Sequence, residues 1–434
     1  MLSAAGLICV ETANRSSSDM QLCKQVSIEM PAFSSQECVS CTSVPVPEVP
    51  PHGARILVAY AGACYRLPDS APCNADDECT ERAPRSPANY GLRDGALFAG
   101  YEVSGIIEAL GSKVDKNSDF SCGDRVIIFP YNGIPHGYAE YVAVPELNYL
   151  IRVPQSLPLS VAAMLPTGAL LARNAVFTAH DCVQQLRASK APGDRCRILI
   201  VGTGGLALWA LRIASHHFKH VPYRDQVVIS VASLRDDELY LAQSHGANVV
   251  QWKENLYESQ IIERTLDACG GKVDIVIDFC PNLRSLQRHF NYLAPGGIVL
   301  ISEETTDRLM PKFDADMPEE MCRRVHSIGE GTLEQLEDLL HLVATKQIEP
   351  PPHTVFSSDE AGEVIRKLCH SRDTRAGHST LPRRGIGRGP RRTTRDGCGG
   401  ARWKKGGRPA ATSGGSGAGK RHETRRSSDL TYCY

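Results

Sequence analysis

The sequence predicts an α/β protein with a β-rich first part, a doubly wound parallel sheet and a disordered basic tail. Between residue 22 and about residue 144, short apolar stretches are interrupted by Pro and Gly, which is typical of a small β domain. Residues 197–301 alternate Val- and Ile-rich runs with helical segments, a pattern that predicts a parallel sheet covered on both faces. From residue 372 the chain is rich in Gly, Arg, Ser and Thr and lacks apolar periodicity, so we expect it to be disordered.

Composition and charge divide the chain into an acidic body and a basic tail. Of the 434 residues, 42% are apolar and 22% are charged, which excludes a fully disordered chain, a collagen and a coiled coil. Residues 372–434 contain 16 Lys and Arg against 4 Asp and Glu, and the preceding residues contain 32 against 45. No uninterrupted apolar run approaches the roughly 18 residues of a membrane helix, so we expect no membrane span.

The cysteines and the first residues bear on the cellular compartment. The chain has 16 cysteines, and those before residue 200 show no repeated spacing, so we expect free thiols in a reducing compartment. No basic residue precedes the mildly apolar stretch 1–10, and the first arginine is Arg15. A secretory signal is therefore not expected. The prediction is a cytoplasmic protein, with the mitochondrion as the alternative.

The expected elements of the first part are strands. Residues 1–21 are polar and Ser-rich, and we expect them to be loose. An acidic, Pro-rich loop is expected over residues 66–96. Period-2 apolar patterns predict strands at 26–28, 39–49, 54–60, 103–110, 124–129 and 138–144.

From about residue 160 the periodicity becomes helical and then alternates. Helical periods predict helices at 161–165, 169–185, 205–218, 236–245, 257–269 and 283–293. Apolar runs predict strands at 197–201, 227–231, 249–250, 273–278 and 297–301. Residues 306–370 are expected to hold a polar connection, a helix at 332–345, a Pro-rich break and a helix at 359–370.

The turn after the strand at 197–201 matches a dinucleotide-binding motif. The segment 202–207 reads Gly-Thr-Gly-Gly-Leu-Ala, which fits G-x-G-x-x-G/A, and it opens a helix. In this motif Gly202 permits the tight turn, Gly204 allows close approach to a pyrophosphate, and Ala207 permits close helix packing. The free N–H groups at the start of the helix then face the phosphates. We expect Gly202, Gly204, Gly205 and Leu206 to hold the pyrophosphate.

The end of the next strand indicates which nicotinamide cofactor binds. An acidic residue there would bind the ribose 2′-OH of NAD, but Ser233 occupies the position and Arg235 follows. A hydroxyl and a guanidinium are able to bind a 2′-phosphate. The prediction is NADP(H) as cofactor, with NAD(H) as the alternative if Arg235 is only a surface charge.

Several motifs together resemble the medium-chain dehydrogenase/reductase family, which includes zinc alcohol dehydrogenases and zinc-free quinone oxidoreductases. The resemblance covers about residues 22–371. It rests on the glycine turn and on the segments 61–64, 100–105, 111–114, 123–126, 246–247, 274–278 and 295–297. It implies a GroES-like catalytic domain at 22–165, a Rossmann domain at 166–305 and a segment at 306–371 that returns to the catalytic domain. The implied active site lies between the two domains.

The resemblance breaks at the catalytic zinc. Cys64 matches the first zinc ligand of the family, but Tyr101 replaces the histidine and Thr167 replaces the third ligand. A phenol and a hydroxyl are poor zinc ligands, so we expect no zinc. The four closely spaced cysteines of the structural zinc site are also missing from residues 129–141.

The pocket that the zinc would occupy then provides the candidate catalytic residues. Tyr101 is expected either to donate a proton or only to fill the vacated metal site. Cys64 and Thr167 would flank the same space. Thr167 and Phe279 would lie near the nicotinamide by family analogy. Glu102, which matches the glutamate behind the metal, is expected to pair with another group, such as an arginine.

The predicted function is a zinc-independent NADP(H)-dependent oxidoreductase that transfers hydride between the nicotinamide and an activated alkene, quinone or carbonyl compound. The alternatives are a catalytically inactive nucleotide-binding redox sensor or scaffold, and a zinc alcohol dehydrogenase-like enzyme. We expect a small-molecule substrate and no membrane partner, and the resemblance allows a homodimer. Nucleic acid would bind only through the basic tail, which is either a lineage-specific addition or a departure from the native reading frame.

Overall fold

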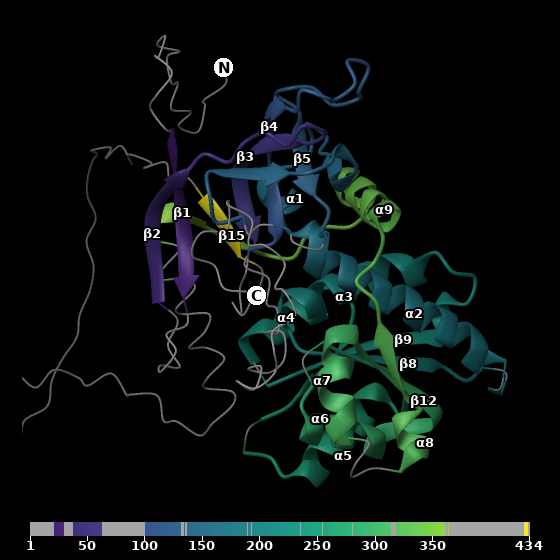
Figure 1. Ribbon diagram of the computed structural model, residues 1–434. Helices are drawn as coiled ribbons and strands as arrows, with labels where there is room; N and C mark the ends of the chain where they lie inside the picture. Colours follow the sequence, from purple (N-terminus) through teal and green to yellow (C-terminus); the bar gives the residue numbers. More distant parts are fainter. Residues whose placement is uncertain are drawn as a thin grey trace, which may run out of the picture.

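The computed structural model describes two sheets and the helices around them. The described residues are 21–29, 38–62, 363 and 429–432, together with 100–360 apart from positions 132–133, 135–136, 189, 192, 235, 254, 280 and 314–317. Figure 1 shows the antiparallel strands in one lobe and the parallel sheet in the other. The expected acidic loop at 66–96 lies outside the described residues.

Five antiparallel strands form the first sheet, in the order β6-β3-β4-β5-β7. Their bounds are β3 Ala54–Gly62, β4 Glu102–Leu110, β5 Arg125–Ile128, β6 Tyr141–Val144 and β7 Leu150–Arg152. A separate hairpin is formed by β1 (Leu22–Glu29) and β2 (Cys38–Pro45). The inward-facing side chains of the sheet form one buried cluster, which includes Ile56, Val103, Ile107, Val126 and Ile128.

The second sheet has six parallel strands in the order β10-β9-β8-β11-β12-β13. Their bounds are β8 Cys196–Val201, β9 Val227–Ser233, β10 Asn248–Gln251, β11 Val273–Asp278, β12 Leu293–Ser302 and β13 Val325–Ile328. The order reverses between β8 and β11, which are neighbours although β9 and β10 separate them in the chain. This topology is the doubly wound fold that the sequence predicts, and its ligand site is expected where the order reverses.

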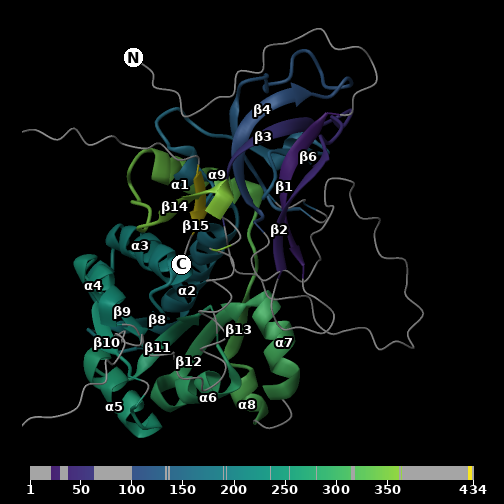
Figure 2. The same cartoon turned by 90° about the vertical axis from the view of Figure 1, so that its left-hand side faces the viewer.

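Helices cover both faces of the parallel sheet because its strands are apolar on both faces. Ile198 and Ile200 of β8 pack into one buried cluster with α2 (Leu170–Arg187) and α3 (Gly205–Lys219). Leu199, which points the other way, packs with α5 (Glu258–Cys269) and α6 (Leu283–Tyr292). Figures 1 and 2 show these helix pairs on opposite sides of the strands. The helix α4 (Asp236–Ser244) connects β9 to β10.

The polar connection expected after residue 306 is wrong in part, because the structure has regular elements there. It contains α7 (Glu303–Phe313), α8 (Glu319–Cys322) and the edge strand β13. The polar start of α7, Glu303-Glu304-Thr305-Thr306, and the proline inside it conceal its helical period. β13 was missed because it has only four residues, of which His326 and Ser327 are exposed.

The chain passes from the first sheet to the second through α1 (Leu159–Ala162), a π-helical turn, η3 (Leu165–Ala169), and then α2. After the parallel sheet, α9 (Leu333–Ala344) packs against α2 and η3. β14 (Thr354–Ser357) follows, and it pairs antiparallel with β15 (Asp429–Tyr432). Figure 2 shows β14, β15, α1 and α9 together at the junction of the two lobes.

The strand β15 lies within the tail expected to be disordered, and it corrects that prediction for residues 429–432, while the remainder of 372–434 lies outside the described residues. Residues 429–432 pair with 357–354, so the end of the tail supplies one strand beside β14. A segment can pair with the free edge of a strand through backbone hydrogen bonds without having apolar periodicity. A prediction based on apolar periodicity therefore missed β15. Among the described helices, none has both the length and the apolar composition needed to cross a bilayer.

Candidate functional site

The glycine turn joins β8 to α3 with the geometry that a phosphate site needs. Gly202 has φ +106°, a conformation that side chains with a Cβ rarely adopt, and its N–H donates to the Ala232 carbonyl at 2.7 Å. Gly204 is the N-cap of α3 and has an extended backbone. Gly204 has no side chain to cap the helix, and no capping side chain is found among the other described residues, so its first N–H groups are available to a ligand. Gly205 and Leu206 form the first turn of the helix.

The predicted cofactor residues on three neighbouring strands come together at one sheet edge. Val201, the last residue of β8, pairs with Ala232 of β9 and with Asp278 of β11. Ser233 and Phe279 each come directly after one of these partners. Both are therefore beside Gly202 at the carboxyl edge, where the strand order reverses. They are also largely buried, with 6% and 7% of their surface exposed.

The hydroxyl of Ser233 is part of the turn itself. Its Oγ lies 3.0 Å from Oγ1 of Thr203, and both side chains are buried. This hydrogen bond joins the end of β9 to the middle of the glycine turn, so it fixes the turn relative to the neighbouring strand. Arg235 lies outside the described residues.

Two of the three predicted catalytic residues, Tyr101 and Thr167, lie in the described part of the chain, and Thr167 contacts the residue that follows Tyr101. Tyr101 immediately precedes β4, is half-buried and packs against the cluster of the first sheet. The next residue, Glu102, accepts hydrogen bonds at Oε1 from the Thr167 hydroxyl and from the Gly168 N–H, the latter at 2.8 Å. Cys64 lies outside the described residues.

These bonds identify two partners of Glu102, which is only 1% exposed. The two hydrogen bonds to its Oε1 come from a hydroxyl and a backbone amide, and such donors stabilise a buried carboxylate. The expected pairing with an arginine stays a prediction. The hydrogen bond between Thr167 and Glu102 also links the two lobes, because Glu102 lies on β4 of the first sheet and Thr167 lies on η3, which leads into the second lobe.

The π-helical turn η3 is a feature that the sequence analysis missed. It holds Thr167 between β4 and α3, since η3 packs against both. π-Helical turns are rare and often occur at functional sites. The available clue was Pro166-Thr167-Gly168 inside an otherwise apolar helical stretch, because neither Pro nor Gly favours a regular helix there.

A buried polar chain behind Phe279 was also missed. Asp278 ends β11, and its Oδ2 lies 2.8 Å from Nε2 of His289 on α6. The other imidazole nitrogen of His289 is hydrogen-bonded to the Tyr292 hydroxyl. His289 and Tyr292 are fully buried, and burial raises the pKa of the Tyr292 phenol well above its usual value. The chain anchors the end of β11 to the helix behind it.

Several buried thiols and one partly buried phenol elsewhere in the described part of the chain are less suited to chemistry. Burial raises the pKa of the thiols of Cys23, Cys182, Cys196 and Cys269, so these cysteines stay protonated and unreactive at neutral pH. Burial likewise raises the pKa of Tyr131, whose ring stacks on Tyr149 at 4.3 Å between centroids.

The chain matches no protein-family model, but individual proteins match over most of its length. It is 24% identical to an NAD-dependent alcohol dehydrogenase of Sulfolobus acidocaldarius, over 74% of this chain and 90% of that one. It is 25% identical to NADP-dependent alcohol dehydrogenase C 1 of Mycolicibacterium smegmatis, over 78% of this chain and 93% of that one.

Solved structures show the same fold. The quinone oxidoreductase from Coxiella burnetii superposes with a TM-score of 0.52 and 20% identity, over 80% of this chain and 95% of that one. Acetophenone reductase from Geotrichum candidum, solved with NAD, gives a TM-score of 0.53 and 17% identity, over 81% and 95%. These matches cover nine-tenths or more of each relative and therefore run through both sheets. Over most of its length the chain is therefore similar to proteins of the medium-chain dehydrogenase/reductase superfamily, and it shares their fold.

Proposed function

We propose that this chain is a zinc-independent, NADP(H)-dependent oxidoreductase that transfers hydride between the nicotinamide and an activated alkene, quinone or carbonyl compound. The observation that carries the proposal is the uncapped start of α3 behind Gly202, with Ser233 and Phe279 beside it on the neighbouring strands. This arrangement is suited to a dinucleotide pyrophosphate. The relatives named as NAD- and NADP-dependent dehydrogenases support the same cofactor class.

The residues at the zinc-ligand positions of the family do not fit zinc. Tyr101 offers a phenol and Thr167 a neutral hydroxyl that is hydrogen-bonded to Glu102, and neither is among the thiolate, imidazole and carboxylate ligands that zinc prefers. Within the described part of the chain, no three His, Cys, Asp or Glu residues cluster so as to hold a metal ion. In this proposal no step of the reaction runs through zinc.

The mechanism then depends on how the chain binds and protonates its ligands. When bound, the nicotinamide supplies a hydride to the electron-poor carbon of the substrate. The N–H groups at the start of α3 hold the pyrophosphate and so fix the cofactor along the sheet edge. The Tyr101 phenol donates a hydrogen bond to the substrate oxygen that gains negative charge. It then transfers its proton to complete the reduction and regains a proton from water.

The preference for NADP(H) rests on the charge at the end of β9. Ser233 brings a hydroxyl rather than a carboxylate to this position, so nothing at that residue repels a 2′-phosphate. Arg235 supplies the positive charge in this proposal. A small-molecule substrate, a cytoplasmic site of action and a homodimer remain further expectations of it.

Cofactor titration tests the proposal. We expect Arg235→Ala to weaken NADPH binding about tenfold or more and to leave NADH binding nearly unchanged. Arg195→Ala is the matched control, because Arg195 is exposed and precedes β8 at the opposite edge of the sheet. Equal NADPH affinity in the two variants would refute the role of Arg235. Stoichiometric zinc in the same preparation would refute zinc independence.

A further inference from the structure

Two adjoining cavities lie along the C-terminal half of α3, away from the glycine turn. Their volumes are about 300 Å³ and about 490 Å³, and His216, His220, Gln347 and Ile348 line both of them. We refer to the two together as the α3–α9 groove, because its walls are α2, α3, α9 and the residues just after α9. Volumes of this size are typical of small-molecule sites.

The groove is positively charged although the body of the protein is acidic. Arg173, Arg212, Lys219 and Lys346 line it, and Glu349 is the one acidic residue among the lining side chains of these two cavities. By contrast, residues 1–371 contain 32 Lys and Arg against 45 Asp and Glu. Part of the positive charge suits the negative end of the α3 dipole, which explains exposed groups such as Lys219. It does not explain the two buried arginines.

Both arginines are buried and incompletely hydrogen-bonded. Arg212 is 9% exposed, and its Nη1 donates to the Glu349 carbonyl at 3.1 Å. Arg173 is 8% exposed, and its Nη2 donates to Asp338 at 3.3 Å. Within the described residues, Nε of each arginine is buried without a hydrogen-bond partner.

The acidic partners of these arginines compensate their charge only weakly. The side chains of Asp338 and Glu349 are 65% and 78% exposed, so water screens both carboxylates. Burial lowers the pKa of both guanidiniums, which shows that burial outweighs their stabilisation by these partners. Buried guanidinium groups with such weakly compensating partners are unfavourable, and the charge of an anion in the groove would compensate them.

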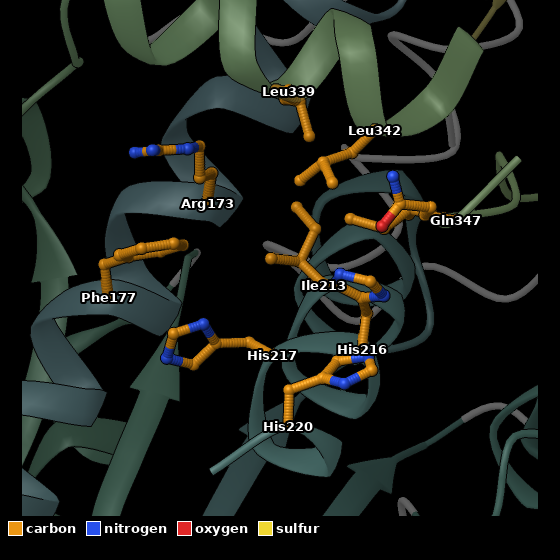
Figure 3. Close-up of a pocket in the computed structure, with 10 residues that line it drawn as sticks. Arg173, Phe177, Ile213, His216, His217, His220, Leu339, Leu342 and Gln347 are labelled. Carbon is orange, nitrogen blue, oxygen red and sulfur yellow. The ribbon is translucent and has the colours of Figure 1, made fainter. Parts of the chain in front are cut away.

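The rest of the groove is apolar and aromatic. Figure 3 shows Leu339 and Leu342 of α9 facing Ile213 of α3, with the imidazoles of His216, His217 and His220 below them. The Arg173 guanidinium lies over the Phe177 ring, 4.2 Å from its centroid. A purely inorganic ion would leave the apolar surface unused. A ligand with both an anionic group and an apolar part would use all of it.

We propose that the α3–α9 groove binds a small amphipathic organic anion, with its charged group against Arg212 and Lys219 and its apolar part on Ile213, Leu339 and Leu342. Arg212 comes seven residues after Gly205 on α3, or roughly 10 Å along the helix axis. The groove is thus a second site, which leaves the start of α3 free for a dinucleotide. It does not depend on the oxidoreductase proposal.

The full-length protein is titrated with 1-anilinonaphthalene-8-sulfonate, a fluorescent aromatic anion. We expect saturable binding that weakens about tenfold in Arg212→Gln and about threefold in the double variant Lys219→Gln/Lys346→Gln. The double variant changes only exposed side chains and so keeps the test valid if Arg212→Gln unfolds. Lys272→Gln is the matched control, because Lys272 is exposed and lies just before β11 outside the groove. Its affinity should equal that of the wild type.

Competition then identifies the chemical source of the ligand. Displacement of the probe by decanoate indicates a carboxylate ligand, and displacement by decyl phosphate indicates a phosphate ligand; either result supports the groove. Equal probe affinity in the wild type and in the double variant would overturn the proposal. So would displacement by NADPH, because the probe would then occupy the dinucleotide site.

Discussion

Replacing Thr167 with valine removes the hydroxyl that links the two lobes through Glu102 and keeps the shape of the side chain. The Glu102 carboxylate is 1% exposed and would keep the Gly168 N–H at 2.8 Å but lose the hydroxyl donor at the same oxygen. A hydrogen bond to a charged group contributes about 1.5–3 kcal/mol, and here a methyl group would replace it against a buried carboxylate. We therefore expect Thr167→Val to lower the free energy of unfolding by about 2 kcal/mol.

Urea denaturation followed by circular dichroism measures this change. The matched control is Thr345→Val, because the Thr345 hydroxyl is exposed and donates to the His341 carbonyl at 2.7 Å, a bond that water can replace. The control should lie within about 0.5 kcal/mol of the wild type. If Thr167→Val unfolds at the same urea concentration as Thr345→Val, the hydroxyl does not stabilise Glu102 and the proposed link between the lobes is refuted.

Three further predictions concern the turn and two titrating groups. Gly202→Ala should weaken NADPH binding about tenfold in calorimetry, because Gly202 has φ +106°, although an added Cβ would meet only Ala207 at 3.7 Å. The control Gly193→Ala is equally strained, at φ +92° before β8, and should leave NADPH affinity unchanged. Equal losses of NADPH affinity in the two variants would contradict a phosphate-binding role for the Gly202 turn. Burial, and then the neighbouring His180, lowers the pKa of His217 from 6.5 to about 4. Protonation therefore favours the unfolded chain, and stability should fall as pH drops from about 6.5 to 4; a His217 resonance titrating near 6.5 would disprove this. Hydrogen bonding from Arg288 lowers the pKa of Glu258 in the folded protein. The ionised Glu258 should therefore stabilise the fold above the usual carboxyl pKa, and this stabilisation should be lost as pH falls through the lowered pKa of Glu258. Glu258→Gln should flatten that part of the pH–stability profile, and an unchanged profile would exclude the ion pair as its cause.

Sequence patterns predicted the parallel sheet well because its strands are buried on both faces. The runs 198–201 and 275–277 are entirely apolar, and the helices between the strands keep a helical period. The turn at Gly202 follows from the same logic, since its motif needs a strand before it and a helix after it. Ser233 and Phe279 meet there because parallel strands end at one edge.

Elements with mixed or short patterns were not predictable in this way. α7 begins with four polar residues, and β13 has only four residues, of which the middle two are polar and exposed. Thr167 and Gly168, which donate to Glu102, lie on the π-helical turn, and no periodicity predicts that turn. They are also 65 and 66 residues away from Glu102 in the sequence. The α3–α9 groove likewise depends on helices that contribute residues more than 100 positions apart, Ile213 and Leu339 among them.

The most direct test of the account is isotope transfer from NADPH carrying deuterium at C4 of the nicotinamide. The full-length protein is first treated with a chelator and its metal content is measured, and a conjugated enone or a quinone is then supplied. The account predicts reduced product with deuterium from the cofactor at the former electron-poor carbon of the enone, at a rate that the chelator leaves unchanged. Loss of deuterium transfer after chelation, restored by added zinc, would contradict it, as would NADPH binding without any transfer.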